Sequence, residues 1–323
     1  MFKKLIIDLK RGDDYYNICS DNNFTTLGEY YFIFEEQRVE KGKDQALIRE
    51  RDDNGIPLNQ TYIDVSEKKL YYSPISIGQM GLAVFHTFLD TENQKDLERF
   101  LKFADWFVEN ADVDTKLGAR WLTDVTLPAY HRTDKWQSAF SQSRAISILL
   151  RAYQRTGKDD YKNLAEKALN SFKYPVADGG VYSETKWGPF YEEYTADIPI
   201  LVLNGHIFAL FGLYDFCRVF PENNISKNLF NSGVQTVLNA IPDFDLGFWT
   251  RYNYCVADFY PSIDPATLTY QRLHIMQLRV MYSIFQDNYF DEVLQMWTKQ
   301  INAFNYLRSG YIKYRALKKL NRL

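Results

Sequence analysis

The stretch SAFSQSRAISILLRAYQRTGKDDYKNLAEKALNSF, residues 138–172, decides the fold class. Its second half spaces apolar residues at intervals of 3, 1, 3, 1 and 3, from Tyr161 to Phe172, which is typical of an amphipathic helix. Its first half carries another apolar stripe with fewer charges, from Ile146 to Tyr153. The link RTGKDD has the glycine and polar residues of a short turn. The stretch therefore predicts a helical hairpin with one inner and one outer helix.

The same pair of patterns occurs four times along the chain. The expected pairs are 77–89 with 94–110, 138–154 with 159–172, 203–218 with 225–240, and 271–285 with 289–306. Gln79, Gln142 and Gly205 mark the inner helices at intervals of 63 residues, and His274 follows after 69. This period leaves connections of about 28 residues, which are usually functional, and argues against tandem repeats with a period near 34. We therefore expect a mainly α fold, an α/α toroid of about four hairpins whose long connections line one mouth.

Residues 1–70 follow a different pattern. The segment EYYFIFEEQRVE (29–40) has the aromatic residues of a strand, and TYIDVSEKKLYYSPI (61–75) alternates apolar and polar residues around a turn. We expect residues 1–70 to form a small strand-containing segment that packs onto a toroidal domain at 71–323.

Composition restricts the possible partners. The 323 residues are 46% hydrophobic, enough for one large domain or a large domain with a small appendage. A net charge of −3 gives no global basic field, so we expect no nucleic-acid partner. No run of about 18 apolar residues predicts a membrane span. Three cysteines without a C-x-x-C pair suit a reducing compartment, so a cytoplasmic location is expected.

Metal and nucleophile motifs are missing from the sequence. The four histidines never fall at i, i+3 or i, i+4, and neither H-E-x-x-H nor G-x-S-x-G occurs, so we expect no catalytic metal and no serine nucleophile. The stretch FYEEYTADIPILVLNGHIFALFGLYDF (190–216) instead places Glu192, Glu193 and Tyr194 just before an apolar helix. This arrangement predicts an active-site lip. A glycosidase pair of Glu193 with an aspartate such as Asp178 or Asp258 stays open.

Five ordered strings resemble a known family. They are YYSPISIGQMGLA (71–83), WQSAFSQSRAISILLRAY (136–153), DGGVY (178–182), the stretch 190–216 and RYNYCVADFYPSIDPATLTYQRLHIMQL (251–278). Over roughly residues 71–323 the chain resembles the C-terminal region of the D-glucuronyl C5-epimerases of heparan sulfate and heparosan-like polymers. The resemblance implies an α/α toroid, a uronic-acid-containing glycan as substrate and no cofactor.

The resemblance also implies site residues. EEYTA is similar to the family's E-E-Y-P-T, which makes Glu193 the catalytic glutamate and Tyr194 its neighbouring tyrosine. Two family tyrosines lie eighteen residues apart, as Tyr252 and Tyr270 do here, and His274 matches the histidine that follows the second. One departure is Cys255, which stands where the family has an arginine.

The expected chemistry calls for further residues. Inverting carbon 5 of a uronic acid requires two acid–base groups that face each other across the ring, and Glu193 and Tyr270 come from different connections. A cation must neutralise the carboxylate. The candidate cations are Arg144, which departs from the family's small or uncharged residue, Arg251 and Arg272. The other candidate binding residues are Gln142, Asn204 and His274, and Asn204 is equally suited to capping a helix.

Three function classes fit the sequence. The first is a uronate C5-epimerase. The second is a polysaccharide lyase, which begins with the same proton abstraction but expels the oxygen on carbon 4. The third is a glycan-binding module without activity. A homodimer stays possible in each case.

Overall fold

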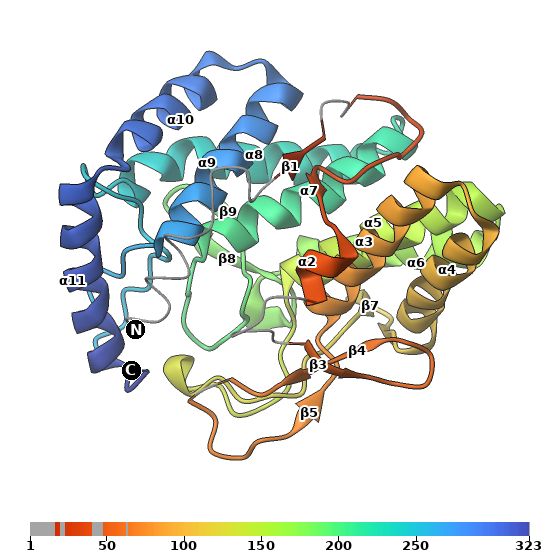
Figure 1. The fold of residues 1–323 in the computed structure, drawn as a ribbon, viewed down its shortest axis with the longest axis horizontal. Coiled ribbons are helices and arrows are strands. Elements are labelled where there is room, and N and C mark those ends of the chain that lie inside the picture. The colour runs from red at the N-terminus through yellow and green to blue at the C-terminus, as the bar shows by residue number, and fades with distance from the viewer. Residues whose placement is uncertain (1–16, 20–22, 41–47, 63, 323) are drawn as a thin grey trace.

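Residues 17–19, 23–40, 48–62 and 64–322 are described by a computed structural model, which is mainly helical (Figure 1). Eight helices pair as hairpins: α3 (Pro74–Thr91) with α4 (Gln94–Glu109), α5 (Ala139–Thr156) with α6 (Asp159–Ala168), α7 (Leu203–Val219) with α8 (Asn224–Phe244), and α9 (Leu268–Phe285) with α10 (Asn288–Gln300). The inner helices α3, α5, α7 and α9 contact one another in chain order. The predicted fold class, a helical toroid of four hairpins, is confirmed.

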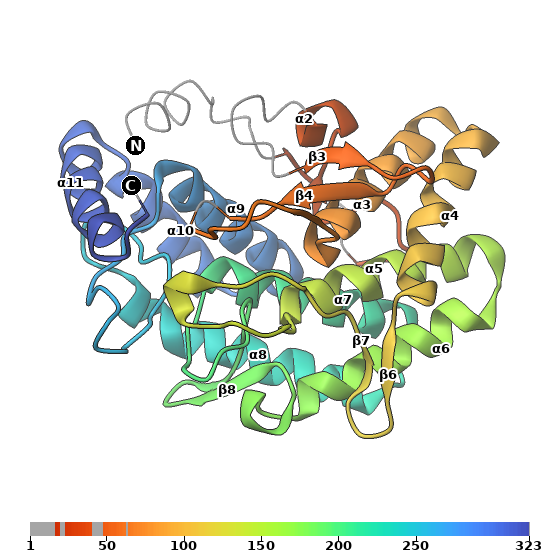
Figure 2. The same cartoon turned by 90° about the horizontal axis from the view of Figure 1, so that it is seen from below.

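The last predicted helix is wrong in its extent. The sequence pattern predicted one helix over 289–306, but α10 ends at Gln300 and α11 (Ala303–Lys319) begins after a break. Asn302 causes the new start because its side chain accepts a hydrogen bond from the backbone N–H of Asn305. Figure 2 shows that α11 lies at the edge of the molecule beside α9 and α10, near the C-terminal end.

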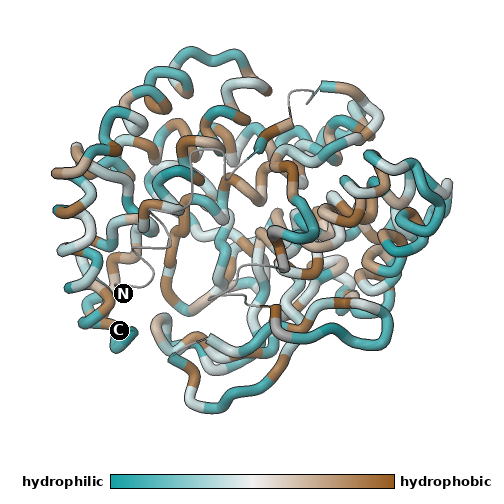
Figure 3. Tube along the Cα trace, viewed as in Figure 1, coloured by the Kyte–Doolittle hydropathy of each residue, from teal (hydrophilic) through white to brown (hydrophobic). Residues whose placement is uncertain are grey.

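Packing explains why each hairpin has an inner and an outer helix. The outer helix α4 buries one stripe of residues, Phe100, Phe103, Ala104 and Phe107, whereas α7 is buried along nearly its whole length. Figure 3 shows hydrophilic residues along the outer side of α4 and α6. The helices α5 and α7 approach closely at Gly212, where an added Cβ would lie 2.5 Å from the Cα of Ser143. The two inner helices therefore form one rigid layer.

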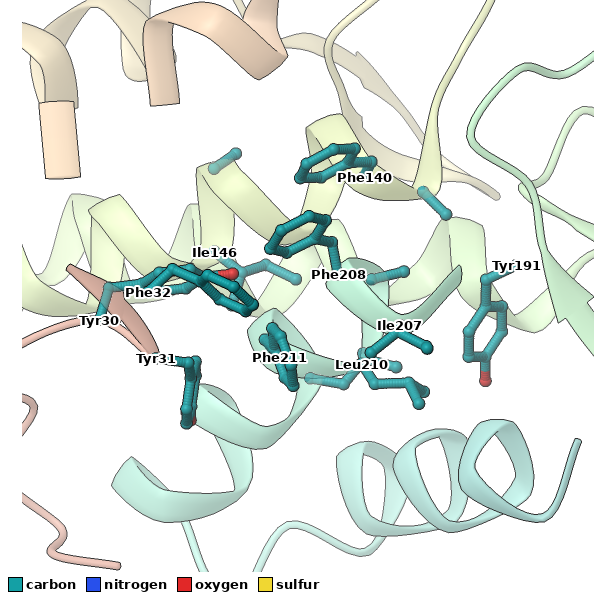
Figure 4. Close-up of a cluster of buried hydrophobic side chains, with 14 of the residues drawn as sticks. Tyr30, Tyr31, Phe32, Phe140, Ile146, Tyr191, Ile207, Phe208, Leu210 and Phe211 are labelled. Atoms are coloured by element: carbon teal, nitrogen blue, oxygen red, sulfur yellow. The ribbon is translucent and has the colours of Figure 1, made fainter. Parts of the chain in front are cut away.

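The N-terminal segment contributes to the main core. Tyr30, Tyr31 and Phe32 are buried, and Phe32 packs against Phe208 of α7 with tilted rings whose centroids lie 5.3 Å apart (Figure 4). Within 29–40 only Phe32–Ile33 is a strand, β2, which pairs with β1 (Asn17–Ile18) and is followed by α2 (Glu36–Glu40). The segment therefore packs onto α7 mainly through its aromatic side chains.

The remaining strands are short and antiparallel. A three-stranded sheet contains β3 (Ile48–Arg51), β4 (Pro57–Gln60) and β5 (Leu70–Tyr71). Two hairpins, β6 (Asp112–Asp114) with β7 (Gly118–Arg120) and β8 (Tyr182–Thr185) with β9 (Gly188–Tyr191), lie inside connections between helices. Short 3-10 helices complete these connections at Pro128–Tyr130, Leu169–Lys173 and Val176–Asp178. Two of the long connections thus contain secondary structure of their own, whereas the connection between α8 and α9 has only isolated bridges.

Cys217 and Cys255 are free thiols, and Cys19 is buried in the N-terminal segment. In the part of the chain that the structure describes, no helix is both long and apolar enough to cross a membrane. Over the same residues, histidine, cysteine, aspartate and glutamate side chains nowhere form a group that could hold a metal ion.

Candidate active site

Glu192 and Glu193 follow β9 and lie where α5 begins. The backbone carbonyl of Glu192 accepts a hydrogen bond from Ala139 N–H at 2.8 Å, and the backbone N–H of Thr195 donates to Gln137 at 3.2 Å. Ser138 caps α5 by accepting from the N–H groups of Phe140 and Ser141. The two carboxylates are therefore fixed at the N-terminal end of the inner helices.

Glu192 holds the chain rather than facing a substrate. Its carboxylate accepts hydrogen bonds from Ser183 Oγ at 2.6 Å, Ile200 N–H at 3.1 Å and Leu201 N–H at 2.9 Å. Leu201 has a φ of 57°, a left-handed conformation that bulky residues rarely adopt. Glu192 therefore stabilises the turn that leads into α7.

Glu193 has fewer partners. It is 5% exposed and accepts a hydrogen bond from Asn204 Nδ2 at 3.2 Å. Its side chain packs against Gly205, where an added Cβ would lie 2.4 Å from the Cβ of Glu193. Burial raises the pKa of Glu193 to about 7, against smaller opposing effects of hydrogen bonds from Tyr194 and Asn204. A carboxylate with this pKa exchanges protons readily at neutral pH.

Tyrosine side chains surround this carboxylate. Tyr194 packs against Tyr130 and Trp136 with ring centroids 5.5 and 5.3 Å apart, and Tyr252 meets Tyr270 edge to face at 5.0 Å. Burial, followed by the charge of Glu193, raises the pKa of Tyr194 and of Tyr252 well above the ordinary value. These phenols therefore keep their protons and are available as donors.

Backbone pairing brings these tyrosines together from distant segments. Val202 forms an antiparallel bridge with Asn253, and Leu203 N–H donates to the carbonyl of Tyr252 at 3.3 Å. Thr267 caps α9, its hydroxyl accepting from the backbone N–H of Tyr270. The structure thus gathers four predicted site residues, Glu193, Tyr194, Tyr252 and Tyr270, at one end of the toroid.

Several residues of the site were not predicted from the sequence. Tyr62 from the N-terminal segment is close enough to Glu193 and Tyr270 for both to affect its pKa, which burial raises most. Tyr260 stacks on Tyr130 at 5.8 Å. We call Tyr62, Tyr130, Tyr194, Tyr252, Tyr260 and Tyr270 the tyrosine cluster. Their positions 62, 130 and 260 lie outside any helical pattern, so the sequence carried no periodic signal for them.

Two cations from the C-terminal segment were also missed. Lys313 of α11 lies 5.1 Å from the centre of the Tyr252 ring and binds Asp264 at 2.6 Å. Arg322 lines a cavity of about 40 Å³ together with Tyr62, Tyr130, Tyr194 and Tyr252. The basic C-terminal segment thus reaches the tyrosine cluster.

Arg144 lies elsewhere, although the sequence suggested it as a substrate-binding residue. It is fully buried, and its guanidinium lies over the rings of Tyr30, Phe34, Phe140 and Phe208 at 4.6 to 5.1 Å. Burial lowers its pKa. The structure therefore places Arg144 in the aromatic core of Figure 4, where Phe140 and Phe208 are shown.

Gln142 and Arg251 hold backbone segments. Gln142 donates to the carbonyls of Ala119 and Ala168, and its own carbonyl accepts from Trp121 N–H. Arg251 donates to the carbonyls of Asp243 and Ser262 at 3.1 and 2.8 Å. Both side chains order the connections around the mouth.

Three further candidates lie on α7 and α9. Asn204 touches Glu193 directly, so the structure brings it into the site. His274 is buried, interacts with Thr250 Oγ1 at 2.9 Å through Nδ1, and its pKa is lowered to about 3 by burial, so it is neutral. Arg272 is half-buried on α9 two residues after Tyr270, and side chains two apart on a helix do not share a face.

The aspartates considered for a glycosidase pair differ from Glu193. Asp178 and Asp258 are both exposed, whereas Glu193 is buried. Asp264, which was not considered, is buried within the site and accepts hydrogen bonds from Tyr260 and Lys313.

A buried carboxylate among tyrosines at the mouth of a helical toroid has the features of a site for acid–base chemistry. The family model described as "D-glucuronyl C5-epimerase C-terminus" matches residues 115–299. The chain belongs to this family.

Individual relatives are distant. The D-glucuronyl C5-epimerase of Caenorhabditis elegans is 27% identical over 242 residues, which make up 69% of this chain and 38% of that enzyme. An uncharacterized protein of Methanocaldococcus jannaschii is 25% identical over 242 residues, 70% of this chain and 76% of that protein. A solved sugar epimerase from a ruminal bacterium matches with a TM-score of 0.55 at 13% identity, over 76% of this chain and 66% of the other. This last similarity shows the shared fold alone.

Proposed function

We propose that this chain inverts carbon 5 of D-glucuronosyl residues in a glycan, giving L-iduronosyl residues. The observation that carries the proposal is Glu193, a buried carboxylate whose pKa is raised to about 7 and which lies among protonated phenols. Membership of the glucuronyl C5-epimerase family supports this chemistry. A heparosan-type polymer is the first substrate to test.

The reaction takes two proton transfers. Ionised Glu193 removes the hydrogen from carbon 5, and the electron pair of the C–H bond moves into the adjacent carboxylate. The phenol of Tyr270 then donates its proton to the opposite face of carbon 5, which inverts the centre. The cycle closes when the proton on Glu193 returns to the phenolate of Tyr270, through solvent or the neighbouring phenols.

Nearby groups assist each transfer. Asn204 orients the Glu193 carboxylate through its hydrogen bond. Tyr252, in edge contact with Tyr270, and Lys313, above the Tyr252 ring, can stabilise the phenolate by hydrogen bonding and by charge. Proton transfer from a phenol to carbon 5 is favourable because the carbon centre of the intermediate is a much stronger base than a phenolate.

Hydrogen exchange in heavy water tests the proposal. We expect the protein to incorporate deuterium at carbon 5 of a glucuronate–glucosamine oligosaccharide and to form iduronate. A lyase would instead give an unsaturated uronate that absorbs ultraviolet light. If a panel of uronate glycans showed neither exchange nor elimination, the enzymatic assignment would be wrong and a binding module would be favoured.

A further inference from the structure

A uronate substrate brings a negative charge into a site that already contains Glu193. The proton-transfer intermediate carries a second negative charge on the same carboxylate, so a cation must lie beside it. Arginine suits this task because its planar guanidinium binds a carboxylate through two parallel hydrogen bonds. The question is which cationic side chain faces the tyrosine cluster.

The described cations differ in how strongly they are engaged. Lys313 is held by the buried carboxylate of Asp264 at 2.6 Å. Arg251 donates to two backbone carbonyls, and Arg144 is enclosed by four aromatic rings. Cys255, buried in the same apolar cluster as Tyr130, brings no positive charge. Arg322 differs from these residues because it lines the cavity beside the tyrosine cluster.

Arg322 is close to the reacting groups. It lines the cavity formed with Tyr130, Tyr194 and Tyr252. Burial lowers its pKa, but Asp64 and the same three tyrosines act in the opposite direction, and the net shift is upward. The side chain is 28% exposed, so it lies at the mouth and not beneath the site.

Its present partner is loosely bound. Arg322 Nε lies 3.4 Å from Asp64 Oδ2, while Asp64 Oδ1 is buried without a hydrogen-bond partner. The contact therefore uses one oxygen of the carboxylate and falls short of the bidentate geometry that makes such pairs strong. Asp64 offers Arg322 the same chemical group that a uronate would.

The cavity is also too small for a sugar in this state. Its volume of about 40 Å³ is close to that of one water molecule, whereas ligand pockets span about 300–1,000 Å³. The Arg322–Asp64 contact joins the end of the C-terminal segment to the N-terminal segment across this cavity. A sugar could therefore enter only if these two residues separated.

We propose that Arg322 is the residue that binds the substrate's carboxylate, and that it exchanges Asp64 for the uronate when the substrate enters. This proposal rests on the uronate substrate of the proposed function. Asp64 then acts as a stand-in for the substrate, keeping Arg322 in place and ionised in the empty site.

A substrate whose uronate carboxylate is neutralised distinguishes carboxylate binding by Arg322 from a purely structural role of this residue. The experiment measures binding and carbon-5 exchange for a glucuronate–glucosamine oligosaccharide and for its methyl ester, which is neutral at the same position. We expect Arg322→Gln to weaken binding of the free acid by about 10- to 100-fold, the range for losing a charge-assisted hydrogen bond, and to change methyl-ester binding by less than about threefold. Arg315→Gln, exposed on α11, the helix that precedes Arg322, is the control and should change neither.

Asp64→Asn should change the affinity for the free acid in the opposite direction. Removing the competing carboxylate should tighten binding of the free acid by about 3- to 10-fold, with no gain for the methyl ester. Arg322→Lys should recover part of the affinity because it keeps the charge but loses the bidentate geometry.

The outcomes distinguish this inference from the proposed function. Equal losses on both substrates, or unchanged binding in Arg322→Gln, would overturn the role of Arg322 while leaving the epimerase proposal standing. Arg322-dependent binding without hydrogen exchange in the unmodified protein would support Arg322 and overturn the epimerase. A protein that neither binds nor exchanges would overturn both.

Discussion

Two buried polar clusters lie at opposite ends of the same pair of helices, α5 and α7. At one end, Asp215 accepts hydrogen bonds from Tyr31 Oη at 2.8 Å and from Arg151 at 2.7 Å, with Arg218 at 3.6 Å. At the other end, Glu193 has Asn204 and its tyrosine neighbours, and the structure gives it no ion pair among the described residues. We call these the paired cluster and the unpaired carboxylate.

The two ends differ in whether their buried charges have ion-pair partners. In the paired cluster Arg151 also donates to the carbonyls of Gly28 and Glu29, so its charges stabilise the attachment of the N-terminal segment. The unpaired carboxylate is buried without a compensating cation, a costly state that raises its pKa toward neutrality. A buried charge that is fully paired holds the fold, whereas one left unpaired is available for chemistry.

The largest expected effect concerns rate at the unpaired carboxylate. Glu193→Gln keeps the shape but removes the base, and Tyr270→Phe removes the opposing proton donor. Each should lower turnover by a factor on the order of 10² to 10⁴. Rates of carbon-5 exchange measure this loss, with Tyr311→Phe, which is 64% exposed on α11, as the control. Near-normal exchange in both variants would remove these residues from the mechanism.

The paired cluster should respond in stability instead. Asp215→Asn leaves the buried charge of Arg151 uncompensated, so we expect a loss of about 3–5 kcal/mol in the free energy of unfolding. Denaturant titration measures this loss. The molecules that remain folded should keep their turnover within about twofold. A small stability loss with a large rate loss would show that the two clusters are not separable.

The sequence predicted most of the helices but missed one break between them. The helices were predicted because the spacing of apolar residues shows which face is buried. Glu193 was predicted because its motif directly precedes the apolar segment that positions it. The break at Asn302 was missed because Ile301, Phe304 and Leu307 continue a helical pattern across it. The side chain of Asn302 nevertheless caps the start of a new helix, α11. A local capping bond overrides periodicity.

The site was predicted where a family motif marks it, at Glu193, Tyr194, Tyr252 and Tyr270, and was missed where no motif does. Tyr62 and Arg322 meet in one cavity although 260 positions separate them, and no spacing rule joins residues that far apart. Arg144 shows the complementary difficulty, since a positive charge in the sequence does not tell stacking on rings from facing a substrate. These assignments need the tertiary arrangement.

A smaller effect is expected from moving the unpaired carboxylate without changing its chemistry. Gly205→Ala adds a Cβ that would lie 2.4 Å from the Cβ of Glu193 and 2.5 Å from Oε2, so the carboxylate must shift. Displacement of a proton-transfer group by about 1 Å can lower the rate about a hundredfold, and we expect a loss of about 10- to 100-fold. Gly310→Ala on α11, with open space around its Cβ, is the control and should leave the rate unchanged. An unimpaired Gly205→Ala protein would mean that the position of Glu193 is not critical.

The smallest expected effect is on pH dependence, where the pKa of Glu193 near 7 has opposite consequences for rate and stability. The base must be ionised, so turnover should rise about tenfold between pH 6 and pH 8 and level off above. For stability, the folded-state pKa lies above the ordinary value of 4.5, so the folded state binds protons more tightly than the unfolded chain. This contribution is fully present below pH 4.5 and is lost as the pH rises through about 7.

Glu192 provides the control for this pH prediction, because burial also raises its pKa to about 7 while its three hydrogen bonds tie it to the backbone and to Ser183. Glu193→Gln should make the residual rate nearly independent of pH, yet its melting temperature should still fall between pH 5 and pH 8 because Glu192 continues to titrate. Melting curves and exchange rates on the same samples test both parts. If the rate of Glu193→Gln still rose tenfold through pH 7, the kinetic pKa would belong to another group. The unpaired carboxylate would then differ from the paired cluster in its electrostatics but not in a catalytic role.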